Sequence, residues 1–280
     1  MKVKELKIKF WEELKEEYPQ EEIGSFFNLL AEEYLKMNRL QMALQPDRDI
    51  SEAENASFEA ALQQLKNHQP VQYIIGETEF FGLKFKVNEA VLIPRPETEE
   101  LVQWILDDTS SAENLKILDI GTGSGCIAIS LAKNLPNAEV FAIDVSENAL
   151  QIAKTNAILN KVEVSFVQQD ILQLESLKEH FNIIVSNPPY VRHLEKSRMQ
   201  RNVLNFEPEL ALYVKDENPL IFYKTITKLA EKSLHPGGKL YFEINQYLAE
   251  ETEELLKMHN FKTSLKKDIF GNYRMLKGNF

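Results

Sequence analysis

The alternation of apolar runs with amphipathic segments after residue 115 constrains the fold most. Runs with the character of buried strands lie at Lys116 to Ile120, Glu139 to Ile143, Val162 to Val167, Phe181 to Val185 and Lys239 to Glu243. Helical patterns lie near Cys126 to Lys133, Glu147 to Leu159, Pro219 to Ser233 and Ala249 to Met258. Such alternation predicts a parallel sheet covered on both faces. With an antiparallel edge from Lys262 to Lys267 and Tyr273 to Gly278, it predicts an α/β domain around a mostly parallel seven-stranded sheet.

The N-terminal part has the pattern of a small helical bundle. One helical face carries Val3, Leu6, Phe10 and Leu14, and a second carries Ile23, Phe26, Phe27, Leu30 and Tyr34. Ser51 and Glu54 have the spacing of a capping box that begins a further helix. From Thr78 to Ile93 the pattern is extended around Gly82 and Asn88, which predicts a β-hairpin. We therefore expect a bundle at residues 1–75, a hairpin linker at 76–93 and the α/β domain at 94–280.

Composition limits the classes of function. A chain of 280 residues that is 44% hydrophobic and 27% charged is ordinary for a globular protein. No apolar run reaches the roughly 18 residues of a spanning helix, and the N-terminus lacks a signal-peptide pattern. The single cysteine, Cys126, cannot form an internal disulfide, and the histidines are scattered without the spacing of a metal site. These features predict a cytoplasmic protein without a membrane segment or a metal.

A glycine-rich loop follows the first strand of the α/β domain and leads into a helix. Its residues are Asp119, Ile120, Gly121, Thr122, Gly123, Ser124 and Gly125. Glycines let the backbone turn tightly against a ligand, and a helix N-terminus presents free N–H groups. A dinucleotide fingerprint would continue with glycine or alanine where Cys126 stands. The spacing resembles instead the S-adenosylmethionine loop of class I methyltransferases.

Acidic residues follow the next strands. Asp144 ends the second strand, where a carboxylate can accept hydrogen bonds from both hydroxyls of a ribose. Asp170, followed by Ile171, comes after the third strand, where such methyltransferases contact adenine. Asp144 alone could cap the next helix, although Ser146 offers a better cap. Because these positions follow successive strand ends, they predict one cofactor site.

A second loop, Asn187-Pro188-Pro189-Tyr190, follows the fourth predicted strand. Asn187 offers a side-chain carbonyl, and Pro188 keeps its carbonyl but has no N–H. The prolines stiffen the backbone and Tyr190 supplies a flat face. Two acceptors beside a ring would orient the NH2 group of a planar amide or base. A proline-rich turn without a catalytic role could have the same sequence. The position of this loop, on the sheet edge that carries the glycine loop, favours methylation of a nitrogen.

Two further blocks make a family resemblance specific. One reads Ile93-Pro94-Arg95-Pro96-Glu97-Thr98-Glu99, and the other is Phe206-Glu207-Pro208 with Leu210-Ala211-Leu212. Together with the two loops, they resemble the HemK/PrmC-type family of protein-(glutamine N5)-methyltransferases, which modify class I peptide chain release factors. The resemblance covers nearly the whole chain. The first block discriminates best, because other methyltransferases share the two loops.

The resemblance implies a class I, Rossmann-like domain that uses S-adenosylmethionine to methylate the glutamine of a Gly-Gly-Gln motif. The cofactor would contact Asp119, Gly121, Thr122, Gly123, Ser124, Gly125, Asp144, Asp170, Ile171 and Asn187. The substrate amide would lie against Asn187, Pro188, Pro189 and Tyr190, with Arg95, Glu97 and Thr98 lining or bracing the pocket. The N-terminal helices would dock the release factor, and we expect a monomer that does not bind nucleic acid directly.

Two rival interpretations stay open. A nucleic-acid N-methyltransferase would hold a flipped base in the same loop, but the net charge of −11 argues against a basic surface. A local basic cluster follows the loop at Arg192, His193, Lys196, Arg198 and Arg201, which fits a solvated face as well as a docking rim. A non-catalytic cofactor-binding protein could share the fold, although the intact loop at residues 187–190 argues against it.

Overall fold

The structure is a computed structural model that describes residues 1–109 and 114–280. It divides into two compact units. The helical unit comprises residues 1–76 and 200–206, and the sheet unit comprises residues 77–199 and 207–280. Each unit is described by itself.

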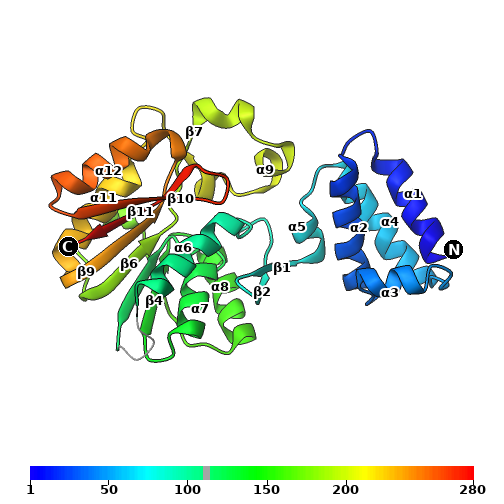
Figure 1. Ribbon diagram of the computed structural model, residues 1–280, viewed down its shortest axis with the longest axis horizontal. Coiled ribbons are helices and arrows are strands. Elements are labelled where there is room, and N and C mark those ends of the chain that lie inside the picture. The colour runs from blue at the N-terminus through cyan, green and yellow to red at the C-terminus, as the bar shows by residue number, and fades with distance from the viewer. Residues whose placement is uncertain (110–113) are drawn as a thin grey trace. The chain divides into compact units, whose positions relative to one another are not determined.

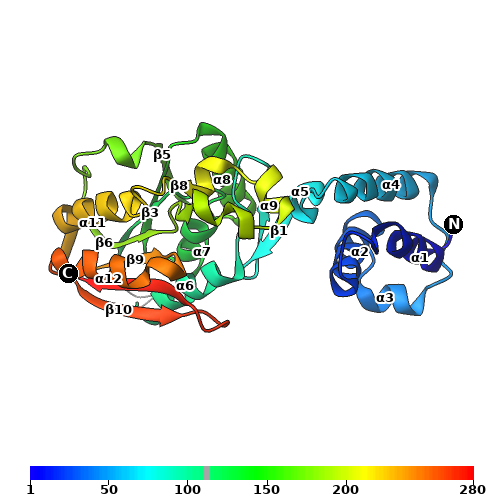
Figure 2. The same ribbon diagram turned by 90° about the horizontal axis from the view of Figure 1, so that it is seen from above.

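The helical unit contains α1 (Val3–Leu14), α2 (Gln20–Tyr34), α3 (Arg39–Leu44), α4 (Glu52–Lys66), α5 (Val71–Ile75) and α9 (Arg201–Phe206) (Figures 1 and 2). The predicted apolar face of α1 is buried, and so are Ile23, Phe27 and Leu30 of α2. Phe10 meets Phe27 edge to face at 5.6 Å between ring centroids. The unit therefore has an apolar core of its own.

The capping box that begins α4 is confirmed. The Ser51 hydroxyl accepts a hydrogen bond from the Glu54 N–H at 3.2 Å, and the Glu54 carboxylate accepts from the Ser51 N–H at 2.8 Å. These two bonds satisfy backbone donors that would otherwise have no partner at the helix N-terminus.

The sheet unit is built on seven strands in the order β10-β11-β9-β6-β3-β4-β5. Their bounds are β3 (Lys116–Ile120), β4 (Glu139–Asp144), β5 (Ser165–Gln168), β6 (Phe181–Ser186), β9 (Leu234–Glu243), β10 (Lys262–Lys267) and β11 (Tyr273–Asn279). The neighbouring strands β9, β6, β3, β4 and β5 pair in parallel. At the edge of the sheet, β11 pairs antiparallel with both β9 and β10. The predicted mostly parallel sheet with an antiparallel edge is confirmed.

Helices cover both faces of this sheet. On one face lie α6 (Pro96–Asp107), α7 (Cys126–Asn134) and α8 (Glu147–Asn160), and on the other lie α11 (Ile221–Ser233) and α12 (Ala249–Met258) (Figure 1). Successive strand residues face opposite layers, so that Ile117 packs in the first core and Leu118 in the second. The strands are apolar on both faces because both are buried.

Short elements complete the sheet unit. These are β7 (Val191–Arg192), β8 (Tyr213–Val214), α10 (Glu209–Leu212) and the 3₁₀ turns η1 (Ile171–Gln173), η2 (His193–Arg198) and η3 (Gln246–Leu248). They lie in the connections between strands and helices. The connections that follow β5 and β6 carry η1 and β7, next to residues of the predicted site.

The predicted hairpin is shorter than the sequence indicated. It consists of β1 (Glu77–Phe80) and β2 (Leu83–Lys86), and the chain then turns at Asn88, whose side-chain oxygen accepts from the Ala90 N–H at 2.9 Å. Asn156 of α8 clamps the end of β2, because its Oδ1 accepts from the Lys86 N–H at 2.6 Å and its Nδ2 donates to the Lys86 carbonyl at 3.0 Å. The hairpin is therefore part of the sheet unit.

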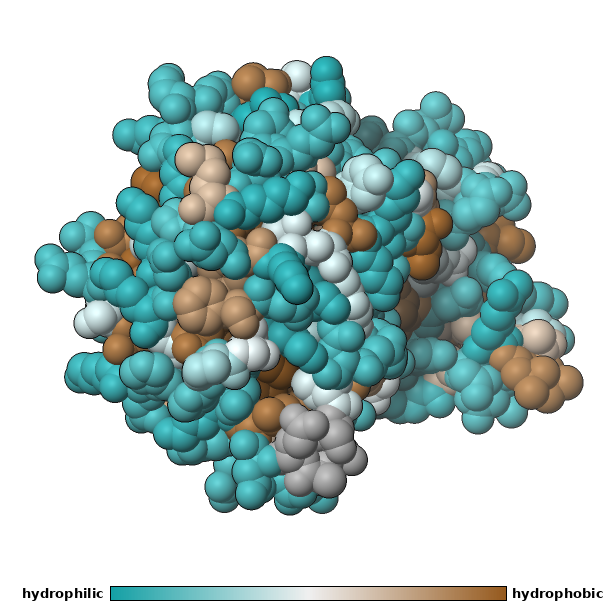
Figure 3. Space-filling view, turned by 60° about the vertical axis from the view of Figure 1, so that its left-hand side comes forward, coloured by the Kyte–Doolittle hydropathy of each residue, from teal (hydrophilic) through white to brown (hydrophobic). Residues whose placement is uncertain are grey.

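One face of the molecule is shown in space-filling form in Figure 3. It carries mostly hydrophilic side chains, with apolar ones in small separate groups. Within the described residues, none of the helices combines the length and the hydropathy that a membrane span requires.

Candidate active site

The glycine loop joins β3 to α7 at the carboxyl ends of the parallel strands. Gly121 and Gly123 have φ of 73° and 55°, values that an L side chain rarely adopts. A Cβ added at either residue would find no atom within 4 Å, so the loop stays open on the side from which a ligand can approach. Both glycines line a cavity of about 350 Å³.

Gly125 has a different role from the first two glycines. Its φ is 83°, and a Cβ there would lie 2.8 Å from the Ile129 side chain and 3.1 Å from the Ala153 Cβ. Ala153 belongs to α8, so Gly125 allows α7 and α8 to approach each other at the start of α7. It does not line the cavity.

Asp144 organises the loop from the neighbouring strand. One carboxylate oxygen accepts from the Gly123 N–H at 2.8 Å and the other from the Ser146 N–H at 2.9 Å. The cap of α8 is Ser146, whose hydroxyl accepts from the Ala149 N–H at 3.2 Å. Asp144 thus keeps its carboxylate at the cavity, where unused lone pairs can accept from ligand hydroxyls.

Asp119 lies fully buried beneath the loop. Its Oδ2 accepts from the Thr122 hydroxyl at 2.6 Å, while Oδ1 has no hydrogen-bond partner within the described parts of the chain. Burial raises the pKa of this carboxyl to about 7. A buried acceptor without a partner is uncommon in native proteins, and Asp119 lies beneath the glycine loop rather than in the lining of the cavity.

Asp170 begins η1, the 3₁₀ turn that follows β5. Its carboxylate accepts from the Leu172 N–H at 2.9 Å and so caps this turn. Asp170 and Ile171 line the cavity beside Leu172, and their contact with adenine stays a prediction.

The cavity brings most of the predicted residues together. Those that line it are Arg95, Thr98, Gly121, Thr122, Gly123, Ser124, Asp144, Asp170, Ile171, Asn187, Pro188 and Pro189. Asp119, Gly125, Glu97 and Tyr190 do not line it. Its volume lies within the usual range for small-molecule sites, and its glycines, apolar wall and carboxylates fit S-adenosylmethionine.

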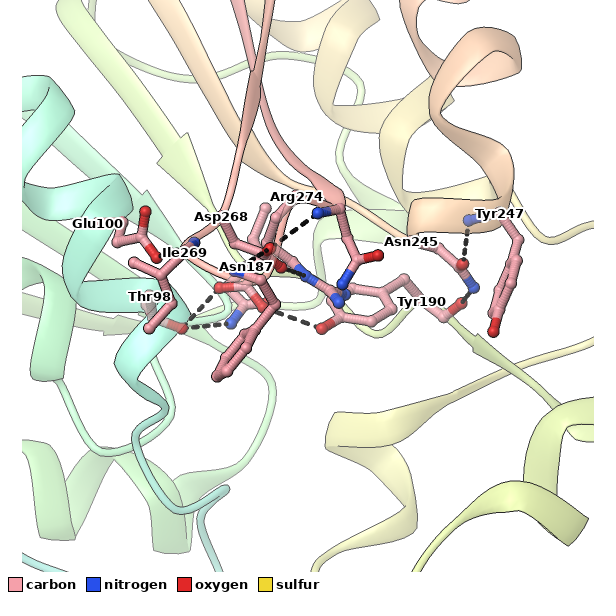
Figure 4. A network of polar contacts seen from close by, with 12 residues as sticks. Thr98, Glu100, Asn187, Tyr190, Asn245, Tyr247, Asp268, Ile269 and Arg274 are labelled. Carbon is pink, nitrogen blue, oxygen red and sulfur yellow. Dashed lines mark hydrogen bonds and ion pairs between the residues drawn. The ribbon is translucent and has the colours of Figure 1, made fainter.

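The Asn187 loop is anchored to a buried carboxylate. The Asn187 side-chain NH2 donates to the Thr98 hydroxyl at 3.3 Å (Figure 4). That hydroxyl donates to Glu243 at 2.6 Å, and the Tyr190 hydroxyl donates to the other oxygen of Glu243 at 2.9 Å. Burial and the Glu243 charge raise the pKa of Tyr190 above its ordinary value. Tyr190 does not line the cavity, and the packing of its ring on the substrate amide stays a prediction.

Arg95 connects the two sequence blocks that carried the family resemblance. Its guanidinium donates to the carboxylate of Glu207 at 2.5 Å, and the Glu207 side chain is only 1% exposed. This ion pair holds the loop before α6 against the loop before α10. Glu97 lies in the first turn of α6, where a negative charge is favoured by the helix dipole.

Glu243 was not among the residues predicted for the site. It ends the buried part of β9 and is 2% exposed, and burial raises its pKa while the Thr98 and Tyr190 hydrogen bonds oppose that shift. A charged residue directly after the apolar residues Leu240, Tyr241 and Phe242 was the available signal. A charge on an otherwise apolar strand indicates a buried polar network.

The chain is similar to known proteins over its whole length. The PrmC N-terminal domain model matches residues 9–76, and the Methyltransferase small domain model matches residues 98–206. A release factor glutamine methyltransferase of Flavobacterium psychrophilum is 56% identical and covers 100% of both chains. One of Bacteroides thetaiotaomicron is 45% identical and covers 95% of this chain and 96% of its own.

Solved structures with low sequence identity share the fold. A methyltransferase from Pyrococcus furiosus has a TM-score of 0.51 at 18% identity and covers 79% of this chain and 96% of its own. A 16S rRNA N2 G1207 methyltransferase of Thermus thermophilus, solved with AdoMet and guanosine, has a TM-score of 0.52 at 17% identity. The match covers 72% of this chain and 49% of its own.

The seven-stranded sheet, the glycine loop and the matching domain model together define a class I, S-adenosylmethionine-dependent methyltransferase. At 56% identity over its full length, the chain belongs to the release factor glutamine methyltransferase family. The resemblance inferred from the sequence is confirmed.

Proposed function

We propose that this protein transfers a methyl group from S-adenosylmethionine to the side-chain N5 of the glutamine in the Gly-Gly-Gln motif of class I release factors. The observation that carries this proposal is the meeting of two loops in one cavity. Gly121, Gly123 and Asp144 lie on the cofactor side of that cavity, and Asn187 and Pro188 lie on the substrate side. Methylation of this glutamine would support translation termination.

The acceptors of the Asn187 loop suit an amide nitrogen. The Asn187 side-chain carbonyl and the Pro188 backbone carbonyl would each accept one N–H of the substrate amide. Pro188 is followed by Pro189, and since neither residue has a backbone N–H, no donor of their backbone competes for the substrate. The two acceptors would hold the NH2 group in one plane.

Orientation is the main contribution that the site can make. An amide nitrogen is a weak nucleophile, because its lone pair is delocalised into the carbonyl group. The cofactor, when bound, supplies an electrophilic methyl group on a sulfonium centre. Holding the nitrogen in line with that methyl can lower the barrier by roughly 7–11 kcal/mol at best. The two carbonyls stabilise the positive charge that develops on nitrogen, and the proton then leaves to water.

The buried carboxylates near the cavity have other tasks in this proposal. Glu243 already accepts from the Thr98 and Tyr190 hydroxyls, and Asp119 lies below the glycine loop. Neither lines the cavity in which the substrate NH2 would lie between Asn187 and Pro188. We therefore assign proton removal to water rather than to a side-chain base.

The two units divide the work in our proposal. The docking site for the release factor would lie in residues 1–75. A linker at residues 76–93 would connect this helical part to residues 94–280, which would bind the cofactor and the glutamine. The protein would act as a monomer in the cytoplasm without binding nucleic acid directly. In support of this division of work, every residue that lines the cavity belongs to the sheet unit.

A labelling experiment tests the substrate class. The protein is incubated with methyl-labelled S-adenosylmethionine and either an unmethylated release factor or total RNA and DNA from the same cells. We expect label in the release factor and background label in the nucleic acids. Label in nucleic acid alone would favour the rival base N-methyltransferase.

A further inference from the structure

Glu243 occupies a position that the proposed chemistry does not use directly. It lies at the carboxyl end of β9, is 2% exposed, and accepts hydrogen bonds from two hydroxyls of different elements. We propose that Glu243 is a positioning residue that acts through Thr98 to fix the side-chain amide of Asn187 with its carbonyl toward the substrate. This inference rests on the proposed function and assigns a further residue to it.

The first step concerns the single proton of the Thr98 hydroxyl. A hydroxyl donates one hydrogen bond and can accept others. Thr98 donates its proton to Glu243 Oε2 at 2.6 Å, a short contact typical of a carboxylate acceptor. The Thr98 oxygen can therefore only accept from its other neighbour, Asn187.

The second step concerns the two ends of the Asn187 amide. One end is an NH2 donor and the other a carbonyl acceptor. Because the Thr98 oxygen can only accept, it selects the NH2 end, which lies 3.3 Å away. The Asn187 carbonyl is then free to accept a hydrogen bond from the NH2 group of the substrate amide. If the Asn187 amide were rotated by half a turn, its NH2 group would face the substrate NH2 group, and two donors would meet.

The third step concerns the second oxygen of Glu243. Oε1 accepts from the Tyr190 hydroxyl at 2.9 Å, and Tyr190 follows Asn187 in the same loop. Glu243 thus holds the loop at both ends, through Thr98 and through Tyr190. Glutamine cannot replace it, because its amide offers one acceptor and one donor where two acceptors are needed.

The first variant is Glu243→Gln, which keeps the side-chain shape. We expect kcat on an unmethylated release factor to fall roughly 10²-fold, the scale for loss of one preorganised polar contact, with the KM for S-adenosylmethionine within a few-fold of wild type. Asp108→Asn is the matched control. Asp108 also accepts from a tyrosine hydroxyl of β9, Tyr241 at 2.6 Å, but follows the opposite end of α6. It should keep wild-type kcat. Wild-type kcat in Glu243→Gln would overturn the inference.

A double variant tests whether Glu243 acts through Thr98. Thr98→Val should lower kcat to a similar extent, and Thr98→Val combined with Glu243→Gln should be no slower than the slower single variant. Residues that act as one unit behave in this non-additive way. Independent effects that multiply in the double variant would contradict the assigned path.

A readout without turnover separates this inference from the proposed function. The side-chain NH2 resonance of Asn187, identified by its loss in Asn187→Ala, should shift in Glu243→Gln and stay in place in Asp108→Asn. An unchanged resonance in Glu243→Gln overturns the positioning role whatever the substrate is. A shifted resonance in a protein that fails to methylate release factors would leave the positioning role supported and refute only the substrate.

Discussion

Asn187 is the residue on which the proposed chemistry depends most, because its carbonyl and that of Pro188 are the acceptors assigned to the substrate amide. Asn187→Ala should lower kcat by at least roughly 10²–10³-fold, since a preorganised polar group at the reacting centre is lost. The Kd for S-adenosylmethionine, measured by calorimetry, should change only a few-fold. Asn134→Ala, at the end of α7, is the control and should keep full activity. Full activity in Asn187→Ala would refute the assigned role.

Asp119 predicts how stability depends on pH. The pKa of its carboxyl is about 7 in the folded protein and near 4 in the unfolded chain. The contribution of Asp119 to the free energy of unfolding is therefore complete below pH 4 and is lost as the pH rises through 7. Asp119→Asn removes this dependence. From pH 5 to pH 8 the free energy of unfolding of the variant should rise by about 3 kcal/mol relative to that of wild type. The reason is that each pH unit below the folded pKa changes the wild-type free energy of unfolding by about 1.4 kcal/mol.

Urea unfolding of both proteins at several pH values measures this difference. A constant difference between wild type and variant from pH 5 to 8 would show that Asp119 is already ionised at pH 5. Since one of its oxygens has no partner within the described residues, such a result would point to a further donor beside this carboxylate in the folded protein.

Site residues could be predicted from sequence where a local motif carried them. The glycine loop and the Asn187 loop are continuous in the chain, so their residues were named and most of them meet in one cavity. Glu243 could not be found in this way. Its partners Thr98 and Tyr190 are 145 and 53 positions away, and local patterns do not encode which side chains meet over such separations.

At the scale of elements, Gly125 links the glycine loop to helix packing. Gly125→Ala should destabilise the protein by about 2–4 kcal/mol, which combines a left-handed backbone with crowding against Ile129 and Ala153. Gly121→Ala is the matched control, with a similar φ and open space around the added Cβ. It should cost only about 1–2 kcal/mol.

Chemical unfolding followed by circular dichroism compares these two glycine variants. Equal losses of stability would show that α7 and α8 can separate to accept a methyl group at Gly125. In that case only the backbone conformation, and not the packing of the helices, would require glycine at these positions of the loop.

Strands and helices of the sheet unit were predicted well, because apolar periodicity is strong where both faces of a sheet are buried. The bounds of β3, α12 and β10 agree with the prediction to the residue. The hairpin was predicted to continue to Ile93, but it ends at Lys86, where α8 supplies the partners of the backbone. Apolar residues after that point, such as Val87 and Val91, are buried without being in a strand.

At the scale of the whole molecule, the helical unit has a core formed by residues between Val3 and Val71. A fragment of residues 1–76 should therefore fold alone, with a cooperative thermal transition in circular dichroism. If this unit docks the substrate, the folded fragment should inhibit methylation of an intact release factor by raising its KM.

The same fragment should leave methylation of a short Gly-Gly-Gln peptide unaffected, because the peptide lacks the docked surface. A folded fragment that inhibits neither reaction would contradict docking by this unit. Inhibition of both reactions would place the contact at the catalytic unit instead. The sequence predicted the helices of this unit from their apolar faces, but a docking role is not encoded in those faces.

The central claim is tested most directly by mass spectrometry of an unmethylated class I release factor after incubation with this protein and S-adenosylmethionine. We predict a gain of one methyl group, which peptide fragmentation assigns to the glutamine of Gly-Gly-Gln. The Asn187→Ala variant should give no gain under the same conditions. A release factor that gains no methyl group, while cofactor binding is still detected, would contradict the claim.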